Sequence, residues 1–173
     1  DFICIGAIKG GTTWLYDQAR LHPDCWMPPI KEIHYFNRAR QREFPQRQFA
    51  AMVPMARAKA NDPRAVAFFE ALAMCEGYGI EPDLYAQAFA PKGDKISGDV
   101  SPGYACLPEV TVAAIARAFP STKIIFMGRD PITRAWSHIS MRWRQGGFNK
   151  RLLWSEAALR GYLDARDMHQ ASF

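Results

Sequence analysis

The sequence predicts an α/β fold of three layers, in which helices flank both faces of a mainly parallel β-sheet. Two short, continuous apolar runs, at residues 2–5 and 123–127, have the pattern of strands that are buried on both faces. Segments with helical periodicity alternate with the predicted strands, which is typical of parallel strand–helix–strand units. The 173 residues suffice for one hydrophobic core. We therefore expect a single domain over residues 1–173.

The expected elements are separated by glycine and proline residues. The expected strands cover residues 2–5, 95–100 and 123–127, and the expected helices cover residues 13–21, 44–60, 63–74, 82–90, 110–119 and 132–145. Gly6 ends the first strand, and Pro23 and Pro120 follow the ends of two helices. In parallel sheets, ligands bind beyond the carboxyl ends of the strands. The turns after Ile5, Val100 and Met127 are therefore the expected binding region.

Composition and charge exclude several classes of protein. Apolar residues make up 49% of the chain and charged residues 23%, which excludes a disordered or fibrous protein. No apolar run reaches the roughly 18 residues that a membrane span needs. The net charge of +5 is concentrated in residues 123–151, which hold seven basic residues and one acidic residue. This segment is either a solvated helix face or an electropositive binding site.

The four cysteines lie at positions 4, 25, 75 and 106. Neither a C-x-x-C pair nor a zinc-type spacing of Cys and His occurs, so we expect no metal. Cys4 and Cys75 lie in apolar runs, where a reduced thiol packs as a small hydrophobic group. Reduced thiols favour a cytoplasmic protein. Because Asp1 already lies in a strand pattern, the alternative is a eukaryotic protein of the Golgi lumen whose anchor has been removed.

A glycine-rich turn follows the first strand and leads directly into a helix. Glycines allow backbone N–H groups to surround an anion, and the helix N-terminus adds partial positive charge. Gly6, Gly11 and Thr13 match the nucleotide-binding pattern G-x-x-x-x-G-K-[ST], but Thr12 replaces its lysine and Lys9 lies three residues earlier. No acidic residue directly follows the run at 124–127 to hold Mg²⁺. The turn predicts a metal-free phosphate site, with an ordinary strand-to-helix turn as the alternative.

A second anion site is predicted where the last strand ends. Arg129-Asp130-Pro131 follows that strand, and Pro131 suits the first turn of a helix. An apolar face of this helix is expected to pack and consists of Ile132, Ala135, Trp136, Ile139 and Trp143; Arg134, Ser137, His138 and Arg142 lie away from it. Arg129 and Ser137 can hold a second phosphate. Alternatively, Arg129 pairs with Asp130 or Glu109.

An acidic residue and a histidine lie close together in a stretch stiffened by prolines. Residues 27–36 are expected to be extended, and they bring Lys31, Glu32 and His34 within four residues. Glu and His are the usual general bases. The alternatives are a surface ion pair between Glu32 and Lys31, and a structural role in the core for His34.

Four motifs occur in a fixed order along the chain. They are K-x-G-T-T at 9–13, H-P at 22–23 with P-x-x-K-E-x-x-[FY]-F at 28–36, a form of G-E-x-S-P-x-Y at 98–104 with Asp99 in place of Glu, and R-D-P-x-x-R-A-x-S at 129–137. With these motifs, the chain resembles the sulfotransferases that use 3'-phosphoadenosine 5'-phosphosulfate (PAPS), particularly their bacterial and carbohydrate-acting branch. The resemblance implies a fold similar to that of P-loop NTPases.

The resemblance also implies a role for each matched residue. Lys9 would stabilise the leaving phosphate, Glu32 would deprotonate the acceptor, and His34 would orient Glu32 or replace it as base. The residues implied in binding the donor PAPS and its product PAP are Lys9, Gly10, Gly11, Thr12, Thr13, Trp14, Arg129 and Ser137. The family's late glycine-rich basic loop does not occur before Phe173. We therefore expect the single domain to be truncated at its C-terminal end.

The expected reaction is the in-line transfer of a sulfuryl group from PAPS to a hydroxyl or amine, without a metal. The acceptor would be a small molecule or a glycan; neither a nucleic-acid partner nor a membrane span is expected, and the oligomeric state is not specified. Two alternatives remain at this point. One is a P-loop phosphotransferase similar to kinases, and the other is a basic nucleic-acid-binding module based on residues 123–151.

Overall fold

A computed structural model of the chain describes residues 1–38, 46–59, 62–74 and 81–144. The strands are β1 (Phe2–Gly6), β2 (Gly98–Val100) and β3 (Lys123–Phe126). The helices are α1 (Thr12–Leu21), α2 (Tyr35–Arg38), α3 (Gln46–Lys59), α4 (Pro63–Ala73), α5 (Pro82–Phe89), α6 (Glu109–Ala118) and α7 (Pro131–Arg144), with 3-10 helices η1 (Ala90–Lys92) and η2 (Pro102–Cys106). The expected strands and helices are thus confirmed to within a few residues. Cys75 lies outside the described residues.

The sheet has three parallel strands in the order β2-β1-β3. The first strand of the sequence is therefore the central one. Its Phe2 and Ile3 pair with Gly98 and Asp99 of β2 on one side, and β3 pairs with it on the other. Because all strands run the same way, the turns that follow them lie at one edge of the sheet, as the sequence predicts.

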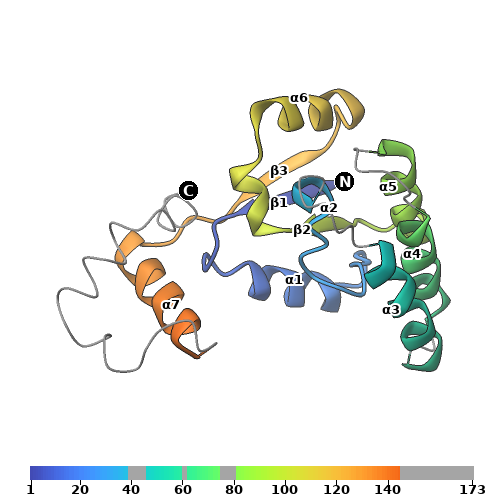
Figure 1. The fold of residues 1–173 in the computed structure, drawn as a ribbon, viewed down its shortest axis with the longest axis horizontal. Helices are drawn as coiled ribbons and strands as arrows, with labels where there is room; N and C mark the ends of the chain where they lie inside the picture. The colour runs from blue at the N-terminus through green and yellow to red at the C-terminus, as the bar shows by residue number, and fades with distance from the viewer. Residues whose placement is uncertain (39–45, 60–61, 75–80, 145–173) are drawn as a thin grey trace.

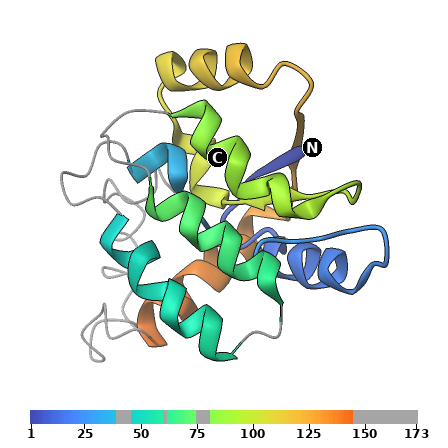
Figure 2. The same cartoon turned by 90° about the vertical axis from the view of Figure 1, so that its right-hand side faces the viewer.

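Helices cover the two faces of the sheet, which confirms the predicted layers (Figure 1). α6 lies on one side of the strands and α1 on the other, and the same arrangement is seen after a quarter turn (Figure 2). Successive residues of β1 point to opposite faces. Ile3 joins a large aromatic cluster with Phe36, Tyr85 and Tyr104, whereas Cys4 packs on the α1 side against Tyr16, Met27 and Val100.

The prediction that the late strand is buried on both faces is wrong. In β3, Ile124 is 59% exposed and Phe126 53% exposed, and Ile125 alone is partly packed, against the cluster on the α1 side. β3 and β2 are both outer strands of the described sheet, yet β2 is buried at all three of its residues. The exposure of β3 therefore reflects faces that the described helices leave uncovered, and not its place at the edge.

The apolar face of α7 also packs less than expected. Ile139 is buried and Ala135 half-buried, but Ile132 is 80% exposed and Trp136 61% exposed. α7 extends away from the sheet at the end of β3, so only part of its surface meets the rest of the described chain (Figure 1). The side chains of Arg142 and Trp143 lie outside what the structure describes.

The stretch 27–36 is extended only in part. The backbone becomes helical at Tyr35, where α2 begins, and before that Glu32 and His34 adopt positive φ angles of 61° and 56°. The change of direction buries Tyr35 and Phe36 in the aromatic cluster. Among the described helices, none is long and apolar enough to cross a membrane.

Candidate functional site

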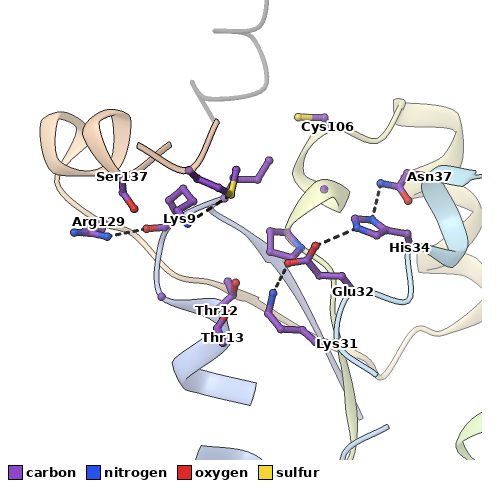
Figure 3. Close-up of a pocket in the computed structure, with 15 residues that line it drawn as sticks. Lys9, Thr12, Thr13, Lys31, Glu32, His34, Asn37, Cys106, Arg129 and Ser137 are labelled. Carbon is purple, nitrogen blue, oxygen red and sulfur yellow. Dashed lines mark hydrogen bonds and ion pairs between the residues drawn. The ribbon is translucent and has the colours of Figure 1, made fainter. Parts of the chain in front are cut away.

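A cavity of about 720 Å³ lies at the carboxyl ends of the strands (Figure 3). Its volume is in the range of ligand-binding pockets. Eight residues predicted to form the site line this cavity: Lys9, Gly11, Thr12, Thr13, Glu32, His34, Arg129 and Ser137. They come from the turn after β1, the stretch before α2, and the segment from the end of β3 into α7. Three segments far apart in the sequence thus form one site.

Two residues of the implied donor set do not line the cavity. Trp14 lies in the first turn of α1, and its side chain is 64% exposed. Gly10 has a different function in the loop, because a Cβ there would lie 2.5 Å from the carbonyl oxygen of Met127 and 2.8 Å from that of Ala7. Only glycine lets the loop approach the end of β3 this closely.

The loop after β1 ends in an open helix N-terminus. Gly10 N–H donates to the Ala7 carbonyl at 2.8 Å, which closes the turn. Gly11 precedes α1 with a φ of 101°, and it has no side chain to cap the helix. Thr12 and Thr13 begin α1 and line the cavity. The first backbone N–H groups of a helix have no partner within it, so this N-terminus suits an anion.

Lys9 links the loop to the last strand and to α7. Its carbonyl oxygen accepts a hydrogen bond from Arg129 Nη1 at 3.2 Å, and its Nζ lies 3.7 Å from the sulfur of Met141. Lys9 and Arg129, 120 residues apart, therefore place two positive charges on one side of the cavity. The alternative pairing of Arg129 with Asp130 is not formed. Instead, Asp130 Oδ1 accepts from Thr133 N–H at 2.8 Å at the start of α7.

The opposite side of the cavity carries a chain of polar contacts (Figure 3). Lys31 Nζ donates to Glu32 Oε1, and Glu32 Oε2 lies 3.3 Å from His34 Nε2. His34 Nδ1 in turn lies 3.1 Å from Nδ2 of Asn37. The hydrogen bond with His34 and then the contact with Lys31 outweigh partial burial and lower the pKa of Glu32 to about 2. Glu32 is therefore a carboxylate at neutral pH, both paired with Lys31 and exposed to the cavity.

Three residues of this site have an unfavourable backbone conformation. Among the described residues other than glycine, positive φ angles occur at Lys9 (64°), Glu32 (61°) and His34 (56°). Such a conformation costs on the order of 1–3 kcal/mol per residue, and it persists where the surrounding contacts impose it. The three residues are the ones that the sequence singles out for catalysis, and all three line the same cavity.

Residues 1–172 match the model of the sulfotransferase family. The chain belongs to this family. No curated protein and no solved structure matches it. Family membership and the parallel sheet between helices agree with the fold class predicted from the motifs. The match also favours sulfuryl transfer over the kinase-like and nucleic-acid-binding alternatives, because the matched family is one of sulfotransferases and the match includes every residue that lines the cavity.

A buried carboxylate, Asp99, organises a hydrogen-bond network next to the cavity of this sulfotransferase. Asp99 is 1% exposed and accepts hydrogen bonds from Ser101 Oγ at 2.6 Å, Tyr104 OH at 2.7 Å and Tyr85 OH at 3.1 Å. Burial raises the pKa of Asp99 in spite of these bonds. Ser101 Oγ also accepts from the backbone N–H of His34 at 3.1 Å. The network therefore connects β2 and η2 to the backbone of His34.

Three side chains outside the expected turns also line the cavity: Asn37, the exposed thiol of Cys106, and Met141. Ile8, Pro102 and Gly103 line it too, and they lie in the turns after Ile5 and Val100 where the sequence predicts the binding region. The sequence contains no helical signal for Asn37, because residues up to Phe36 are expected to be extended and α2 begins only at Tyr35. In the described ranges, no group of three or more His, Cys, Asp or Glu side chains is placed to hold a metal ion.

Proposed function

We propose that the chain transfers a sulfuryl group from PAPS to a hydroxyl or amine, with Glu32 as the general base. The observation that carries this proposal is the contact between Lys9 and Arg129. Two segments that the sequence predicts to bind phosphate, about 120 residues apart, line one cavity. This supports a nucleotide with phosphates at both its 3' and 5' positions as the ligand. The acceptor class, small molecule or glycan, rests on the family resemblance.

The chemistry of the cavity fits such a donor. Lys9, Arg129 and the N-terminus of α1 provide cationic and N–H groups without a carboxylate between them on that side. Glu32 and His34 lie on the other side, where an acceptor would enter. The loop has the closed turn and the open helix end that bind phosphate in other proteins.

The residues divide the reaction between the two sides of the cavity. The bound donor supplies the sulfuryl group, whose bond to the 5'-phosphate oxygen breaks as the bond to the acceptor oxygen or nitrogen forms. Glu32 takes the proton of the acceptor, which requires the acceptor to displace Lys31 from the carboxylate or to reach its second oxygen. Lys9 and the first N–H groups of α1 stabilise the negative charge that develops on the leaving phosphate. Arg129 and Ser137 hold the 3'-phosphate.

A binding experiment tests the donor site without knowledge of the acceptor. We expect PAP, the product nucleotide, to raise the melting temperature more than ATP or AMP in the absence of metal. At a concentration of about 100 times Kd, binding adds roughly 2.7 kcal/mol to the free energy of unfolding. Lys9→Ala and Arg129→Ala should each abolish most of this shift. Two exposed cations outside the cavity, Lys95→Ala and Arg117→Ala, are the matched controls.

The role of Glu32 is tested by separating binding from turnover. Glu32→Ala should keep the thermal shift with PAP and lose the transfer of labelled sulfate from PAPS to a panel of hydroxyl and amine acceptors. Normal turnover in Glu32→Ala would show that another group is the base. A shift that is equal with PAP and ATP would contradict the proposed donor.

A further inference from the structure

The imidazole of His34 is held at both ring nitrogens. Nδ2 of Asn37 lies 3.1 Å from Nδ1, and Oε2 of Glu32 lies 3.3 Å from Nε2. An amide nitrogen donates hydrogen bonds and does not accept them, so Nδ1 accepts here and carries no proton. In the neutral ring the proton is then on Nε2, where it is donated to Glu32. The contact with Asn37 thus decides which nitrogen of His34 is protonated.

The surroundings of Asn37 support this orientation of its amide. Its Oδ1 is buried and has no hydrogen-bond partner among the described residues. If the amide were rotated by half a turn, its NH₂ group would occupy the position of Oδ1. Two buried N–H donors would then lack partners, instead of one buried acceptor. Buried N–H groups without partners are rarer in proteins than buried carbonyl oxygens without partners. The orientation with Nδ2 towards His34 is therefore the less costly one.

The backbone of η2 keeps the amide and the imidazole together. A Cβ at Gly103 would lie 2.7 Å from Asn37 Nδ2 and 3.2 Å from His34 Cε1. Gly103 thus packs directly against the pair and leaves no space for a side chain. His34 is fixed from a third side by Ser101, whose Oγ accepts its backbone N–H. These contacts hold the backbone of His34 and limit the space around its ring and the Asn37 amide.

We propose that Asn37 is a positioning residue that selects the Nε2-protonated tautomer of His34 and so leaves Glu32 as the proton acceptor. In this tautomer Nε2 has no lone pair with which to accept the proton of a substrate. His34 donates to Oε2 of Glu32, and Lys31 donates to Oε1. The acceptor's proton therefore goes to Glu32. The catalytic part of this inference rests on the proposed function, whereas the tautomer is a property of the protein without ligands.

The tautomer is measured directly by NMR on the full chain labelled with ¹⁵N at histidine. The spectrum is recorded at about pH 8.5, where imidazole side chains are neutral, and His34→Gln assigns the signals. We expect a pyridine-type shift for Nδ1 of His34 and a pyrrole-type shift for Nε2. The opposite pattern, an even mixture of tautomers, or two pyrrole-type nitrogens in the wild-type protein would each overturn the proposal.

Variants test whether Asn37 is the cause. In Asn37→Asp the new carboxylate only accepts hydrogen bonds, so Nδ1 of His34 should become protonated and its shift pyrrole-type. Gly103→Ala should displace the Asn37 amide and give a mixture of tautomers, which provides a second measurement if Asn37→Asp does not fold. Gln87→Glu makes the same change from amide to carboxylate on the exposed face of α5 and should leave the spectrum of His34 unchanged. Unchanged shifts in both variants at the site would refute a role for Asn37.

Kinetics distinguish this inference from the proposed function. Asn37→Asp should lower kcat for sulfate transfer about tenfold or more, because His34 no longer donates from Nε2 to hold Glu32 and a correctly placed general base contributes at least that much. It should leave the thermal shift with PAP intact. If the wild-type protein does not bind PAP, the proposed function fails but the tautomer assignment stands. If PAP binds and sulfate is transferred, but Asn37→Asp keeps a normal kcat despite the changed tautomer, the assignment of the base by Asn37 fails alone.

Discussion

The ion pairs of Glu32 should make the stability of the protein depend on pH. Its pKa falls from 4.5 to about 2, first because of the hydrogen bond with His34 and then because of Lys31. A carboxyl group whose pKa is lower in the folded state stabilises the fold above the pKa of the unfolded state. That contribution is lost as the pH falls through the folded-state pKa. The relevant window therefore extends from about pH 5 down to about pH 2.

The size of the effect follows from the shift and from the exposure of the side chain. A fall in the pKa of Glu32 from 4.5 to about 2 corresponds to roughly 3.4 kcal/mol at full strength. The side chain of Glu32 is 44% exposed, however, and solvent screens a pair of this kind. After this correction we expect a contribution of about 1 kcal/mol to the free energy of unfolding at neutral pH.

Urea unfolding of Glu32→Gln and the wild-type protein measures this contribution. At about pH 7 the variant should be less stable by about 1 kcal/mol, and the difference should approach zero near pH 2. Asp94→Asn, which removes an exposed carboxylate outside the cavity, serves as the control and should show no such trend. A difference between Glu32→Gln and wild type that is the same at both pH values would refute the reasoning, because it would show that packing and not charge is responsible.

Two further predictions concern the backbone of the loop and the buried network. Gly10→Ala would place a methyl carbon 2.5 Å from the carbonyl oxygen of Met127, so we expect a loss of about 1–3 kcal/mol in thermal unfolding and no shift with PAP. Gly128→Ala is the control, because the new methyl group has open space around it, and it should unfold like the wild type. Equal losses of stability in Gly10→Ala and Gly128→Ala would contradict the close approach of Gly10 to the Met127 carbonyl oxygen. Ser101→Ala removes the shortest hydrogen bond to Asp99. We expect the free energy of unfolding, measured in urea, to fall by about 1–3 kcal/mol. A fall below a few tenths of a kcal/mol would show that the carboxylate does not depend on this hydroxyl.

The sequence is informative where a local pattern determines the structure. The run Phe2–Ile5 followed by glycines indicates a buried strand and a loop, and both are found, the strand at the centre of the sheet. The motif around Arg129 predicts that this residue reaches the loop, because parallel strands end at the same edge of the sheet. The family model then confirms the family that these motifs indicate.

Features that depend on contacts between distant segments were not predicted. Asn37 and Gly103 meet at His34 only because η2 folds back onto the stretch before α2. Asp99 lies in a strand too short to show a pattern, and its partner Tyr85 is 14 residues away. The exposure of Ile124 likewise depends on how far the helices cover each strand, and an apolar run does not specify this, since β2 at the other edge of the sheet is buried.

The left-handed backbone at Lys9, Glu32 and His34 sets a limit on how this protein can be engineered. Glycine adopts the same angles without steric penalty, so a library selected for heat resistance alone would be enriched in glycine at these positions. Each such change would remove from the cavity a side chain to which the chemistry is assigned. Directed evolution of this fold therefore needs an activity screen in every round, because its most accessible gains in melting temperature are expected to yield inactive proteins.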